Sequence, residues 1–157
     1  MNSHEDRATH DKREYLTFAL GAEQYAVDIL QAQEIRRYDK VTSIANAPNH
    51  VKGVIHLRGN IVPIIDLRVR FGLIDARFNE QTVVIILNLF GTVVGTVVDS
   101  VSDVVEIGAG EIKEAPSVAS DVNISHITGI AAVDGRMLVV LDMAGFMMSE
   151  GLVVTNS

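Results

Sequence analysis

The sequence contains no cysteine and no tryptophan, and only 5% of its 157 residues are aromatic. The lack of cysteine excludes disulfides and thiolate metal sites, and it fits a reducing compartment such as the cytosol. Because aromatic residues are few, Val, Ile and Leu must fill the interior, which suits small barrels and sandwiches. A chain of this length buries enough surface to fold alone, so we expect one domain of one or two lobes.

The sequence also has few basic residues and no hydrophobic run long enough to span a membrane. Only 13 Lys and Arg residues stand against 20 Asp and Glu residues, and the net charge of −7 disfavours binding to a phosphate backbone. The apolar run at 82–90 is much shorter than the roughly 20 residues that span a bilayer. Residues 1–14 are charged and contain no apolar core of a signal peptide. We therefore expect a cytoplasmic protein that neither binds nucleic acid nor inserts directly into the membrane.

A polar, unpatterned N-terminal arm (1–13) comes first, and short strand-like runs dominate the rest of the chain. The period around Glu34 is ambiguous between helix and strand, and we interpret it as strand. A single helical turn is predicted at 46–53 and a short Met-rich helix near 144–149, while Pro63 indicates an edge strand or a bulge. The predicted strands are 15–20, 24–29, a segment through Glu34 and Ile35, 54–57, 61–66, 82–88, 92–99, 101–107, 127–133 and 136–142.

The second half of the sequence repeats the first. Residues 53–67 and 129–143 align without a gap at an offset of 76 residues. Upstream, the pattern of Leu16, Phe18 and Glu34-Ile35 recurs at an offset of 69 residues, at Ile85, Leu87 and Asp103-Val104. Two such units, with hairpins and no long crossover helices, predict an all-β fold of two small five-stranded barrels packed together. A cleft between them would be a catalytic site if polar and an interface if apolar.

The histidines and glycines do not form a recognisable catalytic or ligand-binding motif. Outside the N-terminal arm, His50, His56 and His126 lack the spacing of metal ligands. Ser125 precedes His126, but no nucleophile elbow surrounds it. The glycines at 108–110 lack the lysine of a phosphate-binding loop. These residues are better explained as surface or loop positions.

Paired carboxylates give no stronger indication of catalysis. Asp99 and Asp103 lie close in sequence, whereas Asp66 and Asp142 occupy equivalent strand ends of the two repeats. Such equivalence favours a structural role, such as capping a turn, over acid–base chemistry. We therefore expect a protein that is not an enzyme, with no cofactor and no metal.

Three motifs are specific enough to suggest a family. They are VDIL-x3-EI (27–35), I-x-LRG-x-IVPI-x-DLR (55–68) and VVD-x-VSDV (97–104). With their surroundings, 14–72, 82–105 and 128–143, they resemble the CheW family of chemotaxis coupling proteins. The resemblance runs from residue 14 to about 148, which leaves a flexible arm at 1–13 and a C-terminal tail at 149–157. It implies a CheW-like domain of two SH3-like five-stranded barrels with short helical turns, divided near 72–81 with some strand exchange between the lobes.

The resemblance also implies a function. It predicts a non-catalytic cytoplasmic adaptor, recruited to membrane receptor arrays, in two-component signal transduction. Its partners would be the cytoplasmic tip of a methyl-accepting chemoreceptor and the regulatory domain of the chemotaxis histidine kinase, whose autophosphorylation it would control. The alternative is a CheW-like scaffold module of another receptor–kinase pathway. A fusion to a receiver domain is disfavoured because few residues follow Asp142 and Met143.

The family's functional positions can be matched residue by residue. Glu34 and Arg58 match an acidic–basic pair that could meet across neighbouring strands, and Val83 and Val84 cannot both line one face because neighbouring strand residues alternate. Two departures stand out: His56 replaces an Asn that is common in the family, and Phe90 introduces an aromatic near a hairpin tip. The positions matched to receptor binding are Ala32, Glu34, Gly53, Arg58, Val83, Val84, Val101 and Val104. Those matched to kinase binding are Ile35, Val41, Ile44, Ile55 and Leu57.

Overall fold

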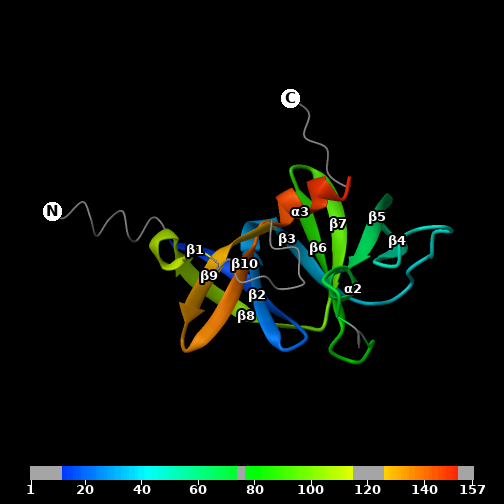
Figure 1. Ribbon diagram of the computed structural model, residues 1–157. Coiled ribbons are helices and arrows are strands. Elements are labelled where there is room, and N and C mark those ends of the chain that lie inside the picture. The colour runs from blue at the N-terminus through cyan, green and yellow to red at the C-terminus, as the bar shows by residue number, and fades with distance from the viewer. Residues whose placement is uncertain (1–11, 74–76, 115–125, 152–157) are drawn as a thin grey trace.

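The computed structural model describes residues 12–73, 77–114 and 126–151 (Figure 1). These residues form ten strands, two short α-helices and two 3-10 turns. The strands are β1 (Lys12–Leu20), β2 (Glu23–Asp28), β3 (Ala32–Arg37), β4 (Val51–Leu57), β5 (Asn60–Asp66), β6 (Val83–Leu89), β7 (Thr92–Val98), β8 (Ser100–Gly108), β9 (Ile127–Val133) and β10 (Arg136–Leu141). The helices are α2 (Leu67–Arg70) and α3 (Met143–Ser149), and the 3-10 turns are η1 (Ile29–Gln31) and η2 (Ala109–Glu111).

Two five-stranded sheets make up the molecule, which confirms the predicted all-β, two-lobe architecture. One sheet has the order β8-β1-β2-β10-β9 and the other β3-β6-β7-β5-β4. We call the first the terminal lobe, because it contains the first and last strands, and the second the central lobe. In Figure 1 the terminal lobe lies on the left and the central lobe on the right.

The internal repeat is visible in the structure. Antiparallel β4–β5 followed by α2 corresponds to antiparallel β9–β10 followed by α3. Asp66 and Asp142 each cap the helix that follows: their carboxylates accept hydrogen bonds from the backbone N–H groups of Arg68 and Gly145, both at 3.0 Å. Their own N–H groups donate to the carbonyls of His50 and His126. The repeated aspartates thus have the structural role that their positions indicate.

The structure corrects two local predictions. Residues 46–50 form turns instead of a helix, and β4 already begins at Val51. Pro63 lies in an interior strand, since β5 is between β4 and β7. The proline is tolerated because β5 pairs with β7 only from Ile64 onward, so no ladder partner faces Pro63 on that side. At the chain ends, β1 includes Lys12 and Arg13 of the predicted arm, whereas residues 1–11 and 152–157 lie outside the described residues.

The contact between the lobes is a hydrophobic core. Side chains from both sheets and from α3 form one cluster, among them Phe18, Tyr25, Ile85, Leu87 and Phe146. Each lobe has a second, smaller cluster of its own. The predicted cleft between the barrels is therefore filled by packed apolar side chains, which hold the two lobes together.

A buried arginine crosses the boundary between the lobes. The Arg68 side chain is fully buried, and its Nε and Nη2 donate to the two carboxylate oxygens of Asp66 at 3.0 and 2.9 Å. Nη1 donates to Asp99 at 3.1 Å, and the other oxygen of Asp99 accepts from the N–H of Gly21 at 2.6 Å. Burial lowers the pKa of Arg68, but the hydrogen bonds to the two carboxylates raise it more, so the guanidinium stays charged. This chain of bonds joins α2 to the β1–β2 turn of the terminal lobe.

A second ionic contact joins α2 to α3. Arg70 Nε lies 2.6 Å from Glu150 Oε1, and His50 Nε2 lies 3.4 Å from the same oxygen. The Arg70 guanidinium also lies 5.5 Å from the ring centre of Phe146, a cation–π contact. The short helix α2 therefore contacts the terminal lobe through two arginines, Arg68 and Arg70.

Candidate partner-binding surface

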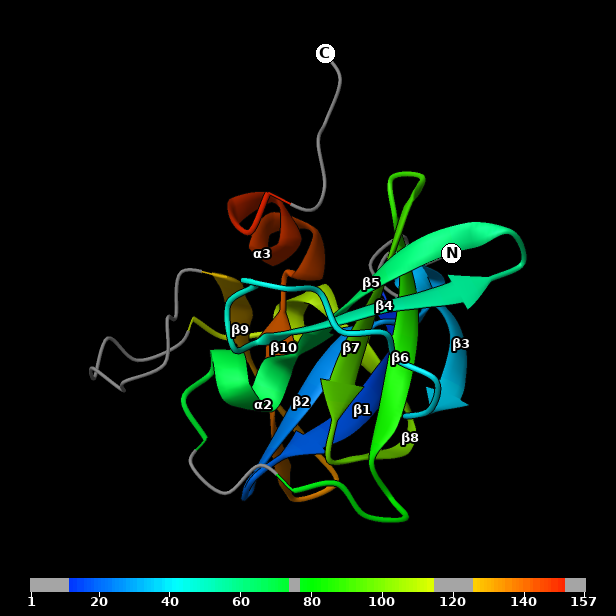
Figure 2. The same ribbon diagram turned by 90° about the vertical axis from the view of Figure 1, so that its right-hand side faces the viewer.

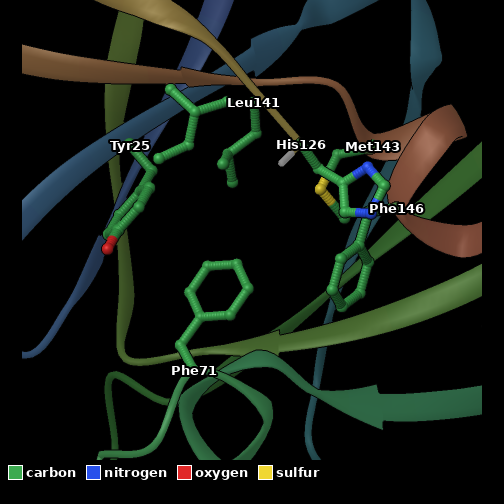
Figure 3. A pocket seen from close by; sticks show the side chains of 7 residues that line it. Tyr25, Phe71, His126, Leu141, Met143 and Phe146 are labelled. Atoms are coloured by element: carbon green, nitrogen blue, oxygen red, sulfur yellow. The ribbon is translucent and has the colours of Figure 1, made fainter. Parts of the chain in front are cut away.

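A cavity between the lobes is too small to be a substrate site. It measures about 10 Å³, which is close to the smallest volume that holds one water molecule. Its lining is mainly apolar and includes Tyr25, Phe71, His126 and Phe146 (Figure 3). Burial, together with the nearby Glu23 carboxylate, raises the pKa of Tyr25 to about 12, so its hydroxyl stays protonated at neutral pH.

The described residues include neither a metal-binding cluster nor a helix able to span a membrane. No group of three or more His, Asp or Glu side chains in 12–73, 77–114 and 126–151 is arranged to hold a metal ion. In the same part of the chain, no helix has the length and apolar character needed to cross a membrane.

Glu34 and Arg58 do meet. Arg58 Nη1 donates to Glu34 Oε1 at 2.5 Å, and Arg36 Nη1 lies 3.5 Å from Glu34 Oε2. Glu34 belongs to β3 and Arg58 to the β4–β5 turn, and β3 and β4 are the two edge strands of the central sheet. The ion pair thus links the two opposite edges of this sheet. Because the Arg58 side chain is 65% exposed, it remains accessible to a partner.

The carboxylate of Glu34 should titrate below the ordinary glutamate range. The hydrogen bond from Arg58 is the main cause of its lowered pKa, supported by the charges of Arg58 and Arg36. A lowered pKa means that the pair contributes fully above the unfolded-state pKa and is lost as the pH falls through the lower folded-state value. In a 13C NMR titration, we expect Arg58→Ala to raise the Glu34 midpoint towards the ordinary value. Identical midpoints in the two proteins would contradict the proposed effect of this contact.

Two residues matched to receptor binding are buried. Val84 is 2% exposed and belongs to the core of the central lobe. Gly53 has φ +141°, and a Cβ added there would lie 1.9 Å from the carbonyl oxygen of Thr42. Thr42 exchanges both backbone hydrogen bonds with Val54, at 2.8 and 2.9 Å. The fold itself therefore explains Val84 and Gly53, whose positions offer no side chain to a partner.

The other apolar residues matched to receptor binding are accessible to different degrees. Ala32, Val83 and Val101 are partly buried against the core that joins the lobes. Val104, on the edge strand β8, is 46% exposed. The difference between Val83 and Val84 follows the predicted alternation along β6. Ala32, Val83 and Val101 thus lie at the boundary between the lobes, whereas Val104 pairs with Leu16 within the terminal lobe.

The residues matched to kinase binding divide in the same way. Ile55 and Leu57 are 8% and 6% exposed and belong to the core of the central lobe. Val41 packs partly against that core, whereas Ile35 and Ile44 are about half exposed. An open groove beside Ile35 is lined mainly by charged and polar residues of β3, the following loop and β4. We call Ile35, Val41 and Ile44 the β3–β4 surface.

The structure also reveals a second exposed ion pair, which sequence reasoning missed. Arg136 Nη1 and Nη2 donate to the two carboxylate oxygens of Asp103 at 3.2 and 3.1 Å. A hydrogen bond from Thr17, and then those from Arg136, lower the pKa of Asp103. Asp103 is the repeat equivalent of Glu34, so the offset of 69 residues could have indicated it. Arg68, in the DLR motif, was also missed, since a lone arginine in sequence is normally read as exposed.

Comparisons with known proteins decide the family. Residues 14–150 match the CheW-like domain. A chemotaxis protein CheW from Klebsiella aerogenes is 48% identical over 145 residues, covering 92% of this chain and 87% of that protein. The chain belongs to the CheW family. Another chemotaxis protein CheW, from Rhizobium meliloti, is 34% identical over 142 residues, covering 90% of this chain and 92% of that protein.

The CheW fold also appears among solved structures. The crystal structure of the scaffolding protein TtCheW from Thermoanaerobacter tengcongensis aligns with a TM-score of 0.76 at 31% identity. The alignment covers 82% of this chain and 88% of that chain. The CheW resemblance of the three sequence motifs is thereby confirmed, as is the fold that it implied.

Proposed function

We propose that this protein is a non-catalytic adaptor of chemotaxis. It binds the cytoplasmic tip of a chemoreceptor and the regulatory domain of the chemotaxis histidine kinase, and so controls kinase autophosphorylation at membrane receptor arrays. Membership of the CheW family supports the role in chemotaxis. The cavity between the lobes offers no room for a substrate, and the larger hollows, among them the groove beside Ile35, are open at the surface, which favours action through surfaces.

The position of two neighbouring residues carries the proposal. Glu34 and Ile35 are adjacent in β3, and side chains of neighbouring strand residues point to opposite faces. Glu34 pairs with Arg58, while Ile35 is 46% exposed beside the charged groove. Both residues border the same groove, so an ion pair and an exposed aliphatic side chain lie next to each other at this edge of the sheet. A protein that holds two partners at once can use such adjacent contacts.

We assign one partner to each surface. The receptor contacts the Glu34–Arg58 pair together with Ala32, Val83, Val101 and Val104. The kinase domain contacts the β3–β4 surface, where the exposed aliphatic side chains of Ile35 and Ile44 supply apolar area and the flanking arginines supply charge. A few apolar and arginine side chains carry most of the binding energy in typical interfaces, so single substitutions should separate the two activities.

Calorimetric binding of each partner to single-site variants tests this assignment. We expect Ile35→Glu to weaken binding of the isolated kinase regulatory domain by about tenfold or more, with receptor binding retained. Arg58→Glu should weaken binding of a receptor signalling fragment by a similar factor and change kinase affinity much less. Arg13→Glu, the same charge change on the exposed start of β1, is the matched control. Equal weakening of both partners by each variant would contradict separate surfaces.

A further inference from the structure

The turn between β6 and β7 contains an unfavourable residue. Phe90 and Gly91 connect Leu89 to Thr92 with φ values of +55° and +88°, which is the pattern of a two-residue type I′ turn. Asn, Asp and Gly are favoured at the first position because they tolerate positive φ, whereas a bulky side chain there is a conformational outlier. The Phe90 side chain is 75% exposed, so its ring adds little to the packing of the protein interior.

Comparison with the other turns makes the choice of phenylalanine stand out. At the repeat-equivalent position the β1–β2 turn has Gly21, at φ +61°, and the β9–β10 turn has the favoured Asp134-Gly135. The β4–β5 turn has Arg58, at φ +51°, which is also unfavourable there. Arg58 is the residue that the proposed function places in contact with the receptor. Strain retained at a highly exposed residue therefore points to binding in both turns.

A second exposed apolar residue lies beside this turn. Leu30 of η1 is 85% exposed. Because Ala32 pairs with Leu87 in antiparallel β3–β6, η1 lies next to the end of β6 that leads into the turn. In Figure 2 the β6–β7 hairpin projects at the top of the molecule, where a partner can reach its tip.

The strand register indicates which partner this turn faces. At one end of the β3–β6 pair, Arg37 pairs with Val83, and the chain continues from there into the loop of the β3–β4 surface. Phe90 and Leu30 lie at the opposite end, beyond Ala32. They are thus next to Ala32, which belongs to the surface assigned to the receptor, and lie at the opposite end of the strand pair from Arg37 and the loop that follows it.

We infer that Phe90 and Leu30 extend the receptor-facing surface and bind an aliphatic segment of the receptor tip. This inference rests on the proposed function. Exposed aromatic side chains are among the residues that most often dominate an interface, because they bury a large area at a low entropy cost. The strain of Phe90 is then maintained by selection for binding, not for folding.

Phe90→Asn tests the inference, because binding and stability should change in opposite directions. Asn-Gly is a favoured type I′ sequence, so the variant should melt at a higher temperature. Its affinity for a receptor signalling fragment should fall about tenfold or more, and Leu30→Ser should lower it in the same direction. Affinity for the kinase regulatory domain should not change. Met137→Asn, at another highly exposed apolar residue, in β10, is the control for loss of apolar surface.

The outcomes separate this inference from the proposed function. Unchanged receptor affinity in both Phe90→Asn and Leu30→Ser, with tight binding by the unsubstituted protein, would overturn the inference and leave the adaptor role intact. A loss of kinase affinity in Phe90→Asn would overturn the assignment of the turn to the receptor. Failure of the unsubstituted protein to bind the receptor fragment would overturn the proposed function, and the inference with it.

Discussion

Arg68→Ala is expected to lower the free energy of unfolding by about 3–5 kcal/mol, because it removes one partner of a buried ion pair. The Asp66 carboxylate is also fully buried and would lose both of its side-chain bonds to the guanidinium. Asp99 would lose the bond that connects α2 to the β1–β2 turn. Urea unfolding followed by circular dichroism, with the midpoint and slope compared between proteins, measures the loss.

Two variants of the same helix provide the comparison. Arg68→Lys keeps the charge but cannot make the two parallel bonds to Asp66, so an intermediate loss is expected. Arg70→Ala removes a partly exposed contact with Glu150 and should cost about 1 kcal/mol. If Arg68→Ala cost no more than Arg70→Ala, the buried network would not be a principal link between the lobes.

Gly53→Ala is expected to destabilise the protein by about 3 kcal/mol or more. A φ of +141° is accessible essentially to glycine alone, and such strain costs about 1–3 kcal/mol. The added Cβ would in addition lie 1.9 Å from the Thr42 carbonyl oxygen, so the backbone bridge between Thr42 and Val54 must move. Because that bridge anchors the loop that carries Val41 and Ile44, kinase binding should weaken as well. Thermal unfolding and calorimetry measure the two effects.

The matched control for Gly53 is Gly110→Ala in η2. No heavy atom lies within 4 Å of a Cβ at Gly110, so little change in stability is expected. A Gly53→Ala protein with the original stability but without receptor binding would show that Gly53 contacts the receptor directly. That result would contradict the structural explanation given above.

Much of the fold could be predicted from the sequence because its signals are local. Alternating apolar residues and the Arg58-Gly59 and Asp134-Gly135 turns indicate hairpins without knowledge of distant contacts. The assignment of the strands to the two lobes was harder to predict from the sequence. That β3 pairs with β6 in the central lobe, while β8 pairs with β1 in the terminal lobe, depends on contacts far apart in the sequence.

Prediction of the candidate site from the sequence was limited in the same way, because burial too depends on contacts far apart in the sequence. Glu34 and Arg58 do form an ion pair, but between opposite edges of the sheet and not across neighbouring strands, and Ile55, Leu57 and Val84 are buried. Period-2 patterning separates the two faces of a strand, yet in β6 apolar residues occupy both faces, so the pattern does not say which is exposed. Likewise, the burial of Arg68 depends on Asp99, which lies 31 residues further along the chain.

Kinase autophosphorylation in a reconstituted mixture of receptor signalling fragments, cognate kinase and this protein is the most direct measurement. We predict that receptor-dependent activity requires the protein, falls about tenfold or more with Arg58→Glu and is retained with Arg13→Glu. Activity that is the same with and without the protein, together with no detectable binding of either partner, would contradict the adaptor function.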